Sequence, residues 1–270
     1  MKKYGVPTAD YATFDSLEPA LAYLDEKGVP LVIKADGLAA GKGVTVAFDI
    51  ETAKSALADI FSGSQGKVVI EEFLDGEEFS LFSFIHDGKI YPMPIAQDHK
   101  RAFDGDKGPN TGGMGAYSPV LHISKEVVNE ALEKVVKPTV AGMIEEGKSF
   151  TGVLYAGLIL TEDGVKTIEF NARFGDPETQ VVLPRLKSDL AQAIIDILAG
   201  NEPTLEWLES GVTLGVVVAA EGYPSQAKLG LILPEIPEGL NVYYAGVSKN
   251  ENNQLISSGG RVYLVSETGE

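Results

Sequence analysis

Residues 32–44, VIKADGLAAGKGV, constrain the fold most, because a Gly- and Lys-rich turn lies between two stretches that predict strands. The apolar run 30–34 predicts a buried strand that ends in Lys34, and residues 44–48 predict the strand that follows. Glycines let backbone N–H groups approach a phosphate that a side chain would block, and two lysines add positive charge. The segment therefore predicts a phosphate-binding turn that joins two strands.

Residue spacing excludes the two most familiar phosphate loops. A P-loop needs G-x-x-x-x-G-K-[ST] before a helix, whereas here Gly37 is one position too close and Gly43 replaces the hydroxyl residue. A Rossmann loop would also open a helix, but a strand is predicted next. A Gly-rich hairpin with solvated lysines is the structural alternative for this segment.

Residues 68–80, VVIEEFLDGEEFS, combine an apolar strand with acidic residues around a turn. A nucleotide base needs backbone N–H and C=O groups in register, an apolar wall and a nearby carboxylate for the ribose. This segment can supply all three. An acidic hairpin that faces solvent would give the same pattern.

Residues 167–178, TIEFNARFGDPE, predict a cation site at a strand end. Glu169 and Asn171 are two residues apart, so their side chains project from the same face of a strand. Carboxylate and amide oxygens suit a hard cation such as Mg²⁺. Arg173 shares that face if the strand continues, where it would suit charge on a transferring phosphoryl group. An ordinary polar strand end is the alternative.

Residues 98–119 are rich in Gly, Asp and Pro and show no period, which predicts a long functional or disordered loop. Lys100, Arg101 and Lys107 stand beside the sequence TGGMG at 111–115. Basic residues next to glycines predict a second anion site, and a mobile surface loop is the alternative. His99 is not expected to act as a base.

The remaining pattern predicts a mixed chain of helices and strands. Two Asp-Gly dipeptides, at 87–88 and 163–164, predict hairpins. Ser124 predicts the start of an amphipathic helix that runs to about Glu146, with a kink or break at Pro138. Other helices are predicted from Asp15 or Ser16 to Gly28, from Asp49 to Gly63 and at 189–198, and further strands at 68–73, 79–85, 89–95, 154–160, 165–170, 211–220 and 261–265.

Length and charge limit the possible functions. A chain of 270 residues suits two or three subdomains. Its net charge of −17 argues against a nucleic-acid partner and gives weight to the few basic residues in Gly-rich segments. No apolar run reaches the roughly 18 residues that span a membrane. Cysteine is absent, which fits a reducing compartment.

The four segments, in this order, resemble those of the ATP-grasp superfamily. Each is similar to the corresponding segment of one family in it, the glycinamide ribonucleotide synthetases. The resemblance runs from KYGVPT at 3–8 to the end of the chain. Lys34, the Gly-rich flap, Glu71–Leu74 and Glu169–Asn171 are generic ATP-grasp features. Segments 98–119 and 171–178 are specific to this one ligase family.

The resemblance implies an α+β ATP-grasp fold with three parts: residues 1–66, residues 67–197 and an incomplete β-rich C-terminal domain at 198–270. ATP would lie between the first two. The implied nucleotide-binding residues are Lys34, Gly41, Lys42, Gly43, Glu71, Phe73, Leu74 and Glu78, with Glu169 and Asn171 as ligands of Mg²⁺ or Mn²⁺. Arg173 and Lys42 would be catalytic. The substrates would contact Asp98, Lys100, Arg101, Thr111, Gly112, Gly113, Met114, Arg173 and Asp176.

The implied reaction joins glycine to 5-phosphoribosylamine in de novo purine biosynthesis, in the cytoplasm, with glycinamide ribonucleotide, ADP and phosphate as products. Glycine would first form a glycyl phosphate with ATP, which the amine of phosphoribosylamine then attacks. Small molecules are the expected partners, not nucleic acid or a membrane. The alternatives are another ATP-grasp carboxylate–amine ligase and a non-catalytic nucleotide-binding module.

Two departures from the family pattern qualify this expectation. The family begins with a Rossmann-like domain that helps to bind phosphoribosylamine and carries a further phosphate-binding lysine upstream, and neither is present here. The C-terminal domain also stops early, at Glu270. We therefore expect a fragment that binds ATP weakly, does not catalyse the full reaction alone, and has the missing N-terminal domain of the same polypeptide as a partner.

Overall fold

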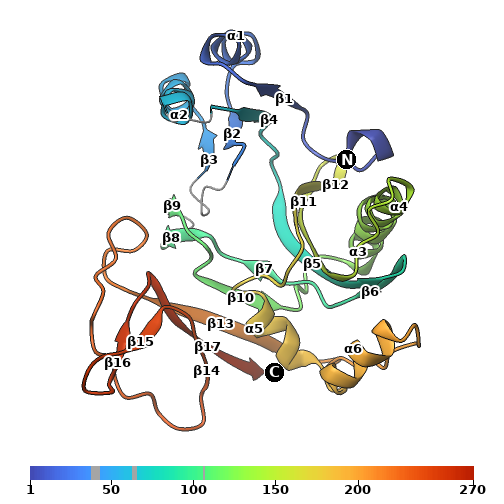
Figure 1. Cartoon of the computed structure of the whole chain (residues 1–270), viewed down its shortest axis with the longest axis vertical. Coiled ribbons are helices and arrows are strands. Elements are labelled where there is room, and N and C mark those ends of the chain that lie inside the picture. Colours follow the sequence, from blue (N-terminus) through green and yellow to red (C-terminus); the bar gives the residue numbers. More distant parts are fainter. Residues whose placement is uncertain (38–42, 63–65, 106) are drawn as a thin grey trace.

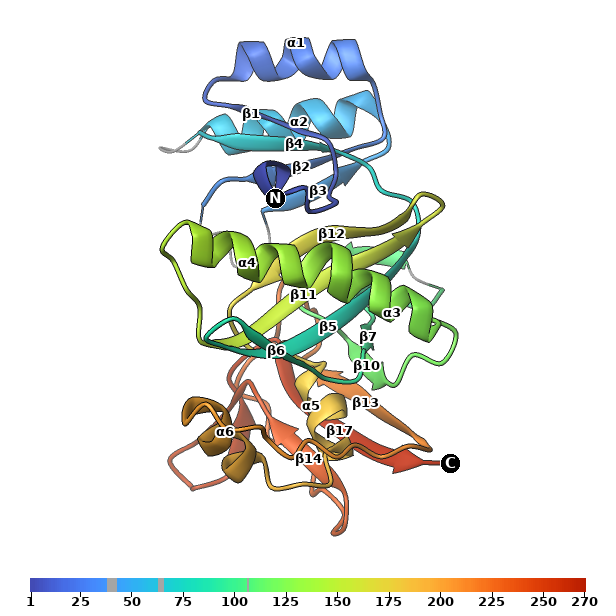
Figure 2. The ribbon, with the colours of Figure 1, turned by 90° about the vertical axis from the view of Figure 1, so that its right-hand side faces the viewer.

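A computed structural model describes residues 1–37, 43–62, 66–105 and 107–270 of the chain. Three layers are stacked along the long axis of the molecule (Figure 1, Figure 2). Each layer is built on an antiparallel sheet, and the N-terminal layer lies at the opposite end of the axis from the C-terminal one. In the described residues, no helix is long and apolar enough to cross a membrane.

The first layer is a four-stranded sheet covered by two helices. The strand order is β1 (Tyr11–Phe14), β4 (Val68–Glu72), β2 (Leu31–Ala35) and β3 (Val44–Ala47), and the helices are α1 (Leu17–Lys27) and α2 (Ile50–Ser62). Leu24 and Leu57 of the helices pack against Ile33 and Ile70 of the sheet, all fully buried. The two predicted strands on either side of the Gly-rich turn are confirmed, and they pair with each other.

Two predicted signals at the ends of these helices are confirmed. The predicted cap of α1 is confirmed only in position, because Ser16 is the N-cap residue but its side chain makes no capping hydrogen bond. Gly28 ends α1 with φ of 74°, a conformation that favours glycine, and its N–H donates to Leu24 O at 2.8 Å. Asp49 caps α2, since its Oδ1 accepts the N–H of Thr52 at 2.7 Å. Helix boundaries of this kind are set within a few residues and can therefore be recognised in sequence.

The second layer is a four-stranded sheet that is buried on both faces. Its order is β12 (Gly164–Asn171), β11 (Gly152–Thr161), β5 (Glu77–His86) and β6 (Lys89–Pro92). Phe79 and Leu81 of β5 pack in the cluster that includes Val135 and Val136 of the long helix. Phe82 and Phe84 point to the opposite face, toward Tyr155 and Val182. Both predicted Asp-Gly hairpins are confirmed.

The long helix of this layer has three parts: α3 (Lys125–Ala131), the π-helical turn η2 (Leu132–Val136) and α4 (Lys137–Glu145). The predicted disturbance at Pro138 takes the form of that π turn. A proline ring clashes with the carbonyl four residues earlier in a regular α-helix, and η2 occupies this position. The helix continues past the proline rather than breaking.

The third layer is a five-stranded sheet with the order β14 (Asn241–Tyr244), β17 (Arg261–Gly269), β13 (Val212–Ala219), β10 (Gly115–Ser118) and β7 (Gln97–Asp98). The short helical elements are η1 (Lys2–Tyr4), α5 (Thr179–Val182), η3 (Leu183–Arg185) and α6 (Leu190–Leu198). Two strand pairs complete the fold: β8 (Arg101–Phe103) with β9 (Lys107–Asn110), and β15 (Val247–Lys249) with β16 (Leu255–Ser257).

The prediction of an irregular loop at 98–119 is wrong, because the segment contains strands β8, β9 and β10 and begins in β7. Gly115 of β10 pairs with Val216 of β13, so the partner strand is remote in sequence. Short strands whose partners are distant leave no local period. The α+β fold class is confirmed by the three layers.

The sheets do not follow the predicted segment limits closely. β4 begins after residue 66, yet it pairs with β1 and β2 of the first layer. β7 and β10 come from the predicted second segment, yet they share a sheet with β13 and β17. The three-part division stays a prediction, and the first sheet reaches Glu72.

Arg185 joins η3 to two segments of the third layer. Its side chain is deeply buried, with the residue 1% exposed. Nη1 donates to Ser118 O at 3.3 Å and to Gly211 O at 2.8 Å, while Nη2 donates to Leu208 O at 2.9 Å and Ser210 O at 3.3 Å. The guanidinium therefore binds four backbone carbonyls from two segments.

We expect Arg185→Met to lower the free energy of unfolding by about 2–4 kcal/mol, because buried carbonyls lose charge-assisted hydrogen bonds. Urea denaturation measures this. Arg185→Lys should fall between wild type and Met, since an ammonium cannot reproduce the planar fork. Lys228→Met, which removes an exposed ion pair with Glu221, is the matched control and should change stability by less than about 0.5 kcal/mol. Equal effects at both positions would contradict the role given to Arg185.

Candidate functional site

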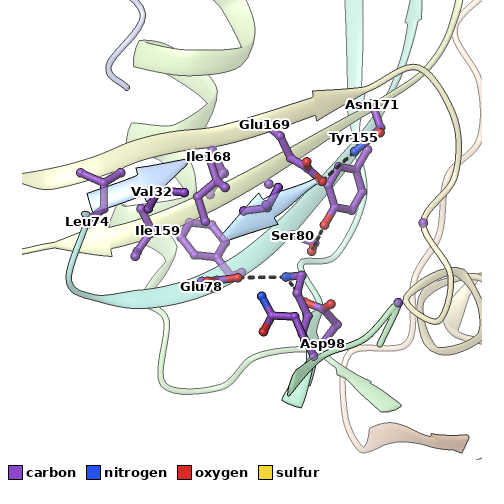
Figure 3. Close-up of a pocket in the computed structure, with 18 of the residues that line it drawn as sticks. Val32, Leu74, Glu78, Ser80, Asp98, Tyr155, Ile159, Ile168, Glu169 and Asn171 are labelled. Carbon is purple, nitrogen blue, oxygen red and sulfur yellow. Dashed lines mark hydrogen bonds and ion pairs between the residues drawn. The ribbon is translucent and has the colours of Figure 1, made fainter. Parts of the chain in front are cut away.

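A cavity of about 350 Å³ lies where the first and second layers meet. Its lining comes from β2 and β3 of the first layer, from β5, β11 and β12 of the second, and from the loops around 110–112 and 173–178. Figure 3 shows this cavity with apolar side chains toward one end and polar ones toward the other. Segments far apart in the sequence therefore form one site.

The apolar end is a slot between the two sheets. Val32 of β2 lies near Ile159 and Ile168 of the second layer, with Leu74 at the outer edge (Figure 3). Phe73 also lines the cavity, and its ring packs on that of Phe48 with centroids 5.1 Å apart. Apolar walls on two sides suit a flat aromatic ligand.

Lys34 lies between the sheets and contacts both. Its Nζ forms an ion pair with Glu71 Oε2 at 2.6 Å and donates to Ile168 O at 3.4 Å. The side chains of Lys34 and Glu71 are only 21% and 20% exposed. A β-bulge interrupts the pairing of β12 with β11 at this point, and bulges often lie next to active sites. Lys34 is thus a partly buried cation beside the slot.

Glu169 and Asn171 project from the same face of β12, as the spacing predicts. The Nδ2 of Asn171 donates to Glu169 Oε1 at 3.0 Å, and both residues line the cavity. Arg173 does not share this face as an extension of the strand, because β12 ends at Asn171. Arg173 still lines the cavity, and its Nη1 donates to Phe174 O at 2.9 Å. Across the described ranges, no three His, Cys, Asp or Glu side chains form a metal-binding group.

A polar cluster that is buried at Ser80, Tyr155 and Glu178 and more exposed at Lys100 and Glu78 forms the floor of the cavity. Lys100 Nζ contacts Glu78 Oε2 at 2.9 Å and Asp98 Oδ1 at 3.1 Å. The Ser80 and Tyr155 hydroxyls are 3.0 Å apart, and Ser80 Oγ donates to Glu178 Oε1 at 3.3 Å. These contacts join residues of four separate segments (Figure 3).

Sequence analysis missed Ser80, Tyr155 and Glu178. Ser80 and Tyr155 lie within long apolar strands, where alternation suggests core positions. Glu178 lies in the GDPE turn that was noted, but nothing local shows that its side chain turns inward to become 3% exposed. Only the pairing of β5 with β11, and the return of the chain after β12, brings these groups together.

Burial and charge shift the pKa values of this cluster. Burial raises the pKa of Glu178, and the neighbouring Asp98 carboxylate raises it further. Burial also raises the pKa of the Tyr155 hydroxyl. Burial lowers the pKa of Lys100, but Asp98 and Glu78 outweigh this effect, so the net shift is upward. The floor therefore combines a fixed ammonium with a carboxyl group that resists ionisation.

The other predicted site residues divide into three groups. Asp98, Thr111, Gly112 and Asp176 line the cavity together with Lys100. Glu71 and Glu78, which were predicted to bind the nucleotide, line it as well. Among the described residues, the cavity lining does not include Gly43, Arg101, Gly113 or Met114. Arg101 instead donates from Nη1 to Gly108 O at 2.9 Å within its own hairpin. Gly41 and Lys42 lie outside the described residues.

Comparison with known families matches two models to this chain. The phosphoribosylglycinamide synthetase ATP-grasp (A) domain matches residues 1–179, and the phosphoribosylglycinamide synthetase C domain matches residues 213–270. The first match covers more than half of the chain.

Individual relatives agree. A phosphoribosylamine–glycine ligase of Streptococcus pyogenes serotype M3 is 59% identical over 275 residues, which cover 99% of this chain and 65% of the relative. One of Listeria innocua is 57% identical over 278 residues and is covered to 66%. The crystal structure of phosphoribosylamine–glycine ligase from Thermotoga maritima superposes with a TM-score of 0.90 at 35% identity, covering all of this chain and 69% of that one. The chain thus spans about two thirds of the length of its relatives.

More distant structures share the fold alone. The biotin carboxylase domain of Hydrogenobacter thermophilus 2-oxoglutarate carboxylase, solved with MgADP, has a TM-score of 0.72 at 17% identity. The predicted ATP-grasp fold is confirmed by these superpositions and by the family match.

The raised pKa of Glu178 predicts a pH-dependent stability. Because folding raises this pKa above its ordinary value of 4.5, the stability linked to the protonated carboxyl is present at low pH. This contribution to stability is lost as the pH rises through the pKa that Glu178 has in the folded state. We therefore expect the stability of wild type relative to Glu178→Gln to fall as the pH increases from about 4 to about 8. Urea denaturation at a series of pH values measures this difference, and the exposed Glu162→Gln is the control. The prediction would be contradicted if the stability difference between wild type and Glu178→Gln depended on pH as little as the difference for Glu162→Gln.

Proposed function

Because the chain belongs to the phosphoribosylglycinamide synthetase family, we propose that its cavity is the ATP site of a ligase that joins glycine to 5-phosphoribosylamine. The products are glycinamide ribonucleotide, ADP and phosphate. One observation carries the proposal: an apolar slot, a lysine, an oxygen pair and a buried polar floor follow one another in a single cavity. Action in de novo purine biosynthesis in the cytoplasm belongs to the same proposal.

The slot supports binding of adenine, with Val32 on one side and Ile159 and Ile168 on the other. In this proposal, backbone groups of Glu71, Phe73 and Leu74 bind the base edge, and Glu78 binds the ribose. Lys34, which lines the cavity beside the slot, would bind the α- and β-phosphates. Gly41, Lys42 and Gly43 would cover the β- and γ-phosphates from the flap.

The oxygen pair at the end of β12 fits Mg²⁺ or Mn²⁺. Asn171 uses its amide nitrogen to bind Glu169, which directs its amide oxygen away from that bond as a possible ligand beside the carboxylate. Mg²⁺ is commonly held by one or two protein oxygens together with phosphate oxygens and water. When bound, the ion would neutralise phosphate charge during transfer. Arg173, which also lines the cavity, is proposed to stabilise charge on the γ-phosphoryl group.

The polar floor supports substrates that carry an amine. Asp98 and Glu178 are carboxyl groups at the closed end of the cavity, and both glycine and phosphoribosylamine carry an amino group. Lys100 and the Thr111–Gly112 turn provide donors for the anionic parts of these substrates. We place Asp176 in the same set. Arg101, Gly113 and Met114 could act only through their backbone or through neighbours, given their positions outside the lining.

The proposed chemistry has two steps. A carboxylate oxygen of glycine attacks the γ-phosphorus of ATP, and the bond from that phosphorus to the ADP oxygen breaks. The amine nitrogen of phosphoribosylamine then attacks the carbonyl carbon of the glycyl phosphate, the C–O bond to phosphate breaks, and the nitrogen loses a proton. The protein contributes position and charge stabilisation, which together can supply most of the rate enhancement of such a transfer.

The reaction itself tests the proposal when the chain is assayed joined to the family's N-terminal domain, because the chain alone is expected not to catalyse the full reaction. ADP formation should require both glycine and 5-phosphoribosylamine, and glycinamide ribonucleotide should accumulate in equal amount. ADP formation that needs a different carboxylate or amine would identify another ATP-grasp ligase. Tight binding of ATP without turnover under any substrate pair would instead favour a nucleotide-binding module.

A single substitution separates an enzyme site from a polar strand end. Glu169→Ala should weaken Mg²⁺-dependent binding of a non-hydrolysable ATP analogue at least about tenfold, because one anionic ligand of the ion is lost. Calorimetric titration with and without Mg²⁺ measures this. Glu162→Ala removes an exposed carboxylate from the same hairpin and should leave the affinity unchanged. Equal affinity of the Glu169→Ala variant and wild type would refute the proposed metal site.

A further inference from the structure

Thr111 and Gly112 of the turn Thr111–Gly113 line the cavity, but a side chain from the C-terminal region holds this turn. Arg261, the first residue of β17, donates from Nη1 to Gly112 O at 2.9 Å and to Gly113 O at 3.3 Å. The same Nη1 donates to Asp176 O at 2.9 Å, and Nη2 pairs with Asp176 Oδ2 at 3.1 Å. One guanidinium therefore ties together two loops of the proposed substrate site.

Tyr223 provides a second contact from the same region. Its hydroxyl accepts the N–H of Gly112 at 3.1 Å, so both backbone groups of Gly112 are bound by C-terminal side chains. The Tyr223 ring lies against Gly260, where a Cβ would overlap it. Gly260 precedes Arg261, so the two contacts come from neighbouring parts of one structure.

Close packing makes the position of this turn depend on Arg261. A Cβ on Gly112 would lie 2.9 Å from Arg261 Cζ, and one on Gly113 would lie 2.5 Å from Pro177 Cδ. Gly113 also has φ of 109°, which side chains disfavour. The backbone of the turn thus touches the guanidinium and the 176–177 segment directly.

The turn is also bound to the backbone of Lys100, whose side chain lies on the cavity floor. Thr111 N–H and Oγ1 both donate to Lys100 O at 2.7 Å, and Gly113 N–H donates to Thr111 Oγ1 at 3.0 Å. A continuous series of hydrogen bonds therefore runs from Arg261 through Gly113 and Thr111 to the backbone carbonyl of Lys100.

We infer that Arg261 and Tyr223 are positioning residues for the substrate half of the site. They hold Thr111–Gly113 and Asp176 for the glycine and phosphoribosylamine of the proposed reaction, on which this inference rests. Neither residue appears in the described lining of the cavity, so they act through the turn rather than on the reacting atoms. Both lie in the part matched by the C domain, whereas the turn and Asp176 lie in the part matched by the A domain.

The test uses four variants of the chain, each joined to the family's N-terminal domain as in the assay above: Arg261→Met, Arg261→Lys, Tyr223→Phe and, as control, Lys228→Met, which removes an exposed C-terminal cation. Amide hydrogen exchange at 112–114 reports the order of the turn. Steady-state kinetics report KM for glycine, phosphoribosylamine and ATP separately. Thermal unfolding verifies that each variant is folded.

We expect faster exchange at 112–114 in Arg261→Met and a rise in KM for glycine or phosphoribosylamine of about tenfold or more, from the loss of charge-assisted hydrogen bonds. KM for ATP should stay within about twofold of wild type. Arg261→Lys should recover part of the effect because it keeps the charge, and Tyr223→Phe should mainly speed exchange of Gly112. Lys228→Met should match wild type throughout.

Unchanged exchange in Arg261→Met would overturn the inference. So would faster exchange with unchanged KM for both substrates, or an equal rise in KM for ATP, which would show a general loss of structure. If wild type forms no ADP with glycine and phosphoribosylamine, the proposed function fails, and the exchange measurement alone then decides whether Arg261 orders the turn.

Discussion

The site depends on strand β12, because the first layer of the molecule contacts the second along it. Lys34 of β2 reaches the Ile168 carbonyl, and Lys166 pairs with Glu72 at 3.1 Å. The segment before β1 also binds this strand, since Thr167 N–H donates to Pro7 O at 2.8 Å. β12 then ends in the Glu169–Asn171 oxygen pair. The contacts that fix the distance between the sheets are therefore made by the same strand that presents the proposed metal ligands.

Charge pairing explains how a chain with a net charge of −17 can offer a site to anions. Lys34 is paired with Glu71, and Lys100 with Glu78 and Asp98, so both lysines are already oriented without a ligand. Side chains that are ordered in advance lose less entropy on binding. The acidic partners thus serve to hold the cations in place, and the raised pKa of Lys100 shows that they outweigh the cost of burial.

Features that depend on a few neighbouring residues could be predicted from the sequence. Features that depend on contacts between segments remote in the sequence could not. The strands on either side of the Gly-rich turn, the cap at Asp49 and the common face of Glu169 and Asn171 follow from spacing over a few residues. Glu178 and Tyr155 enter the site only through pairing and turning of remote segments, so their surroundings in sequence resemble a turn and a core strand. Arg173 shares this strand face only if the strand continues, and nothing in the local sequence shows that β12 ends two residues before it.

Glycine content alone is an ambiguous sign of a phosphate site, as the segment 111–115 demonstrates. A Cβ on Gly112 would meet Arg261, and a Cβ on Gly113 would meet Pro177. A Cβ on Gly115 would lie 2.6 Å from Gly215 O across the sheet. Each glycine thus has a packing cause that requires no ligand. The case for substrate binding here rests instead on Thr111 and Gly112, which line the cavity, and on their hydrogen-bonded connection to Lys100. A glycine-rich segment is evidence for a binding site only where its backbone faces the cavity. Within this turn, Gly112 meets that condition because it lines the cavity, and Gly113 does not.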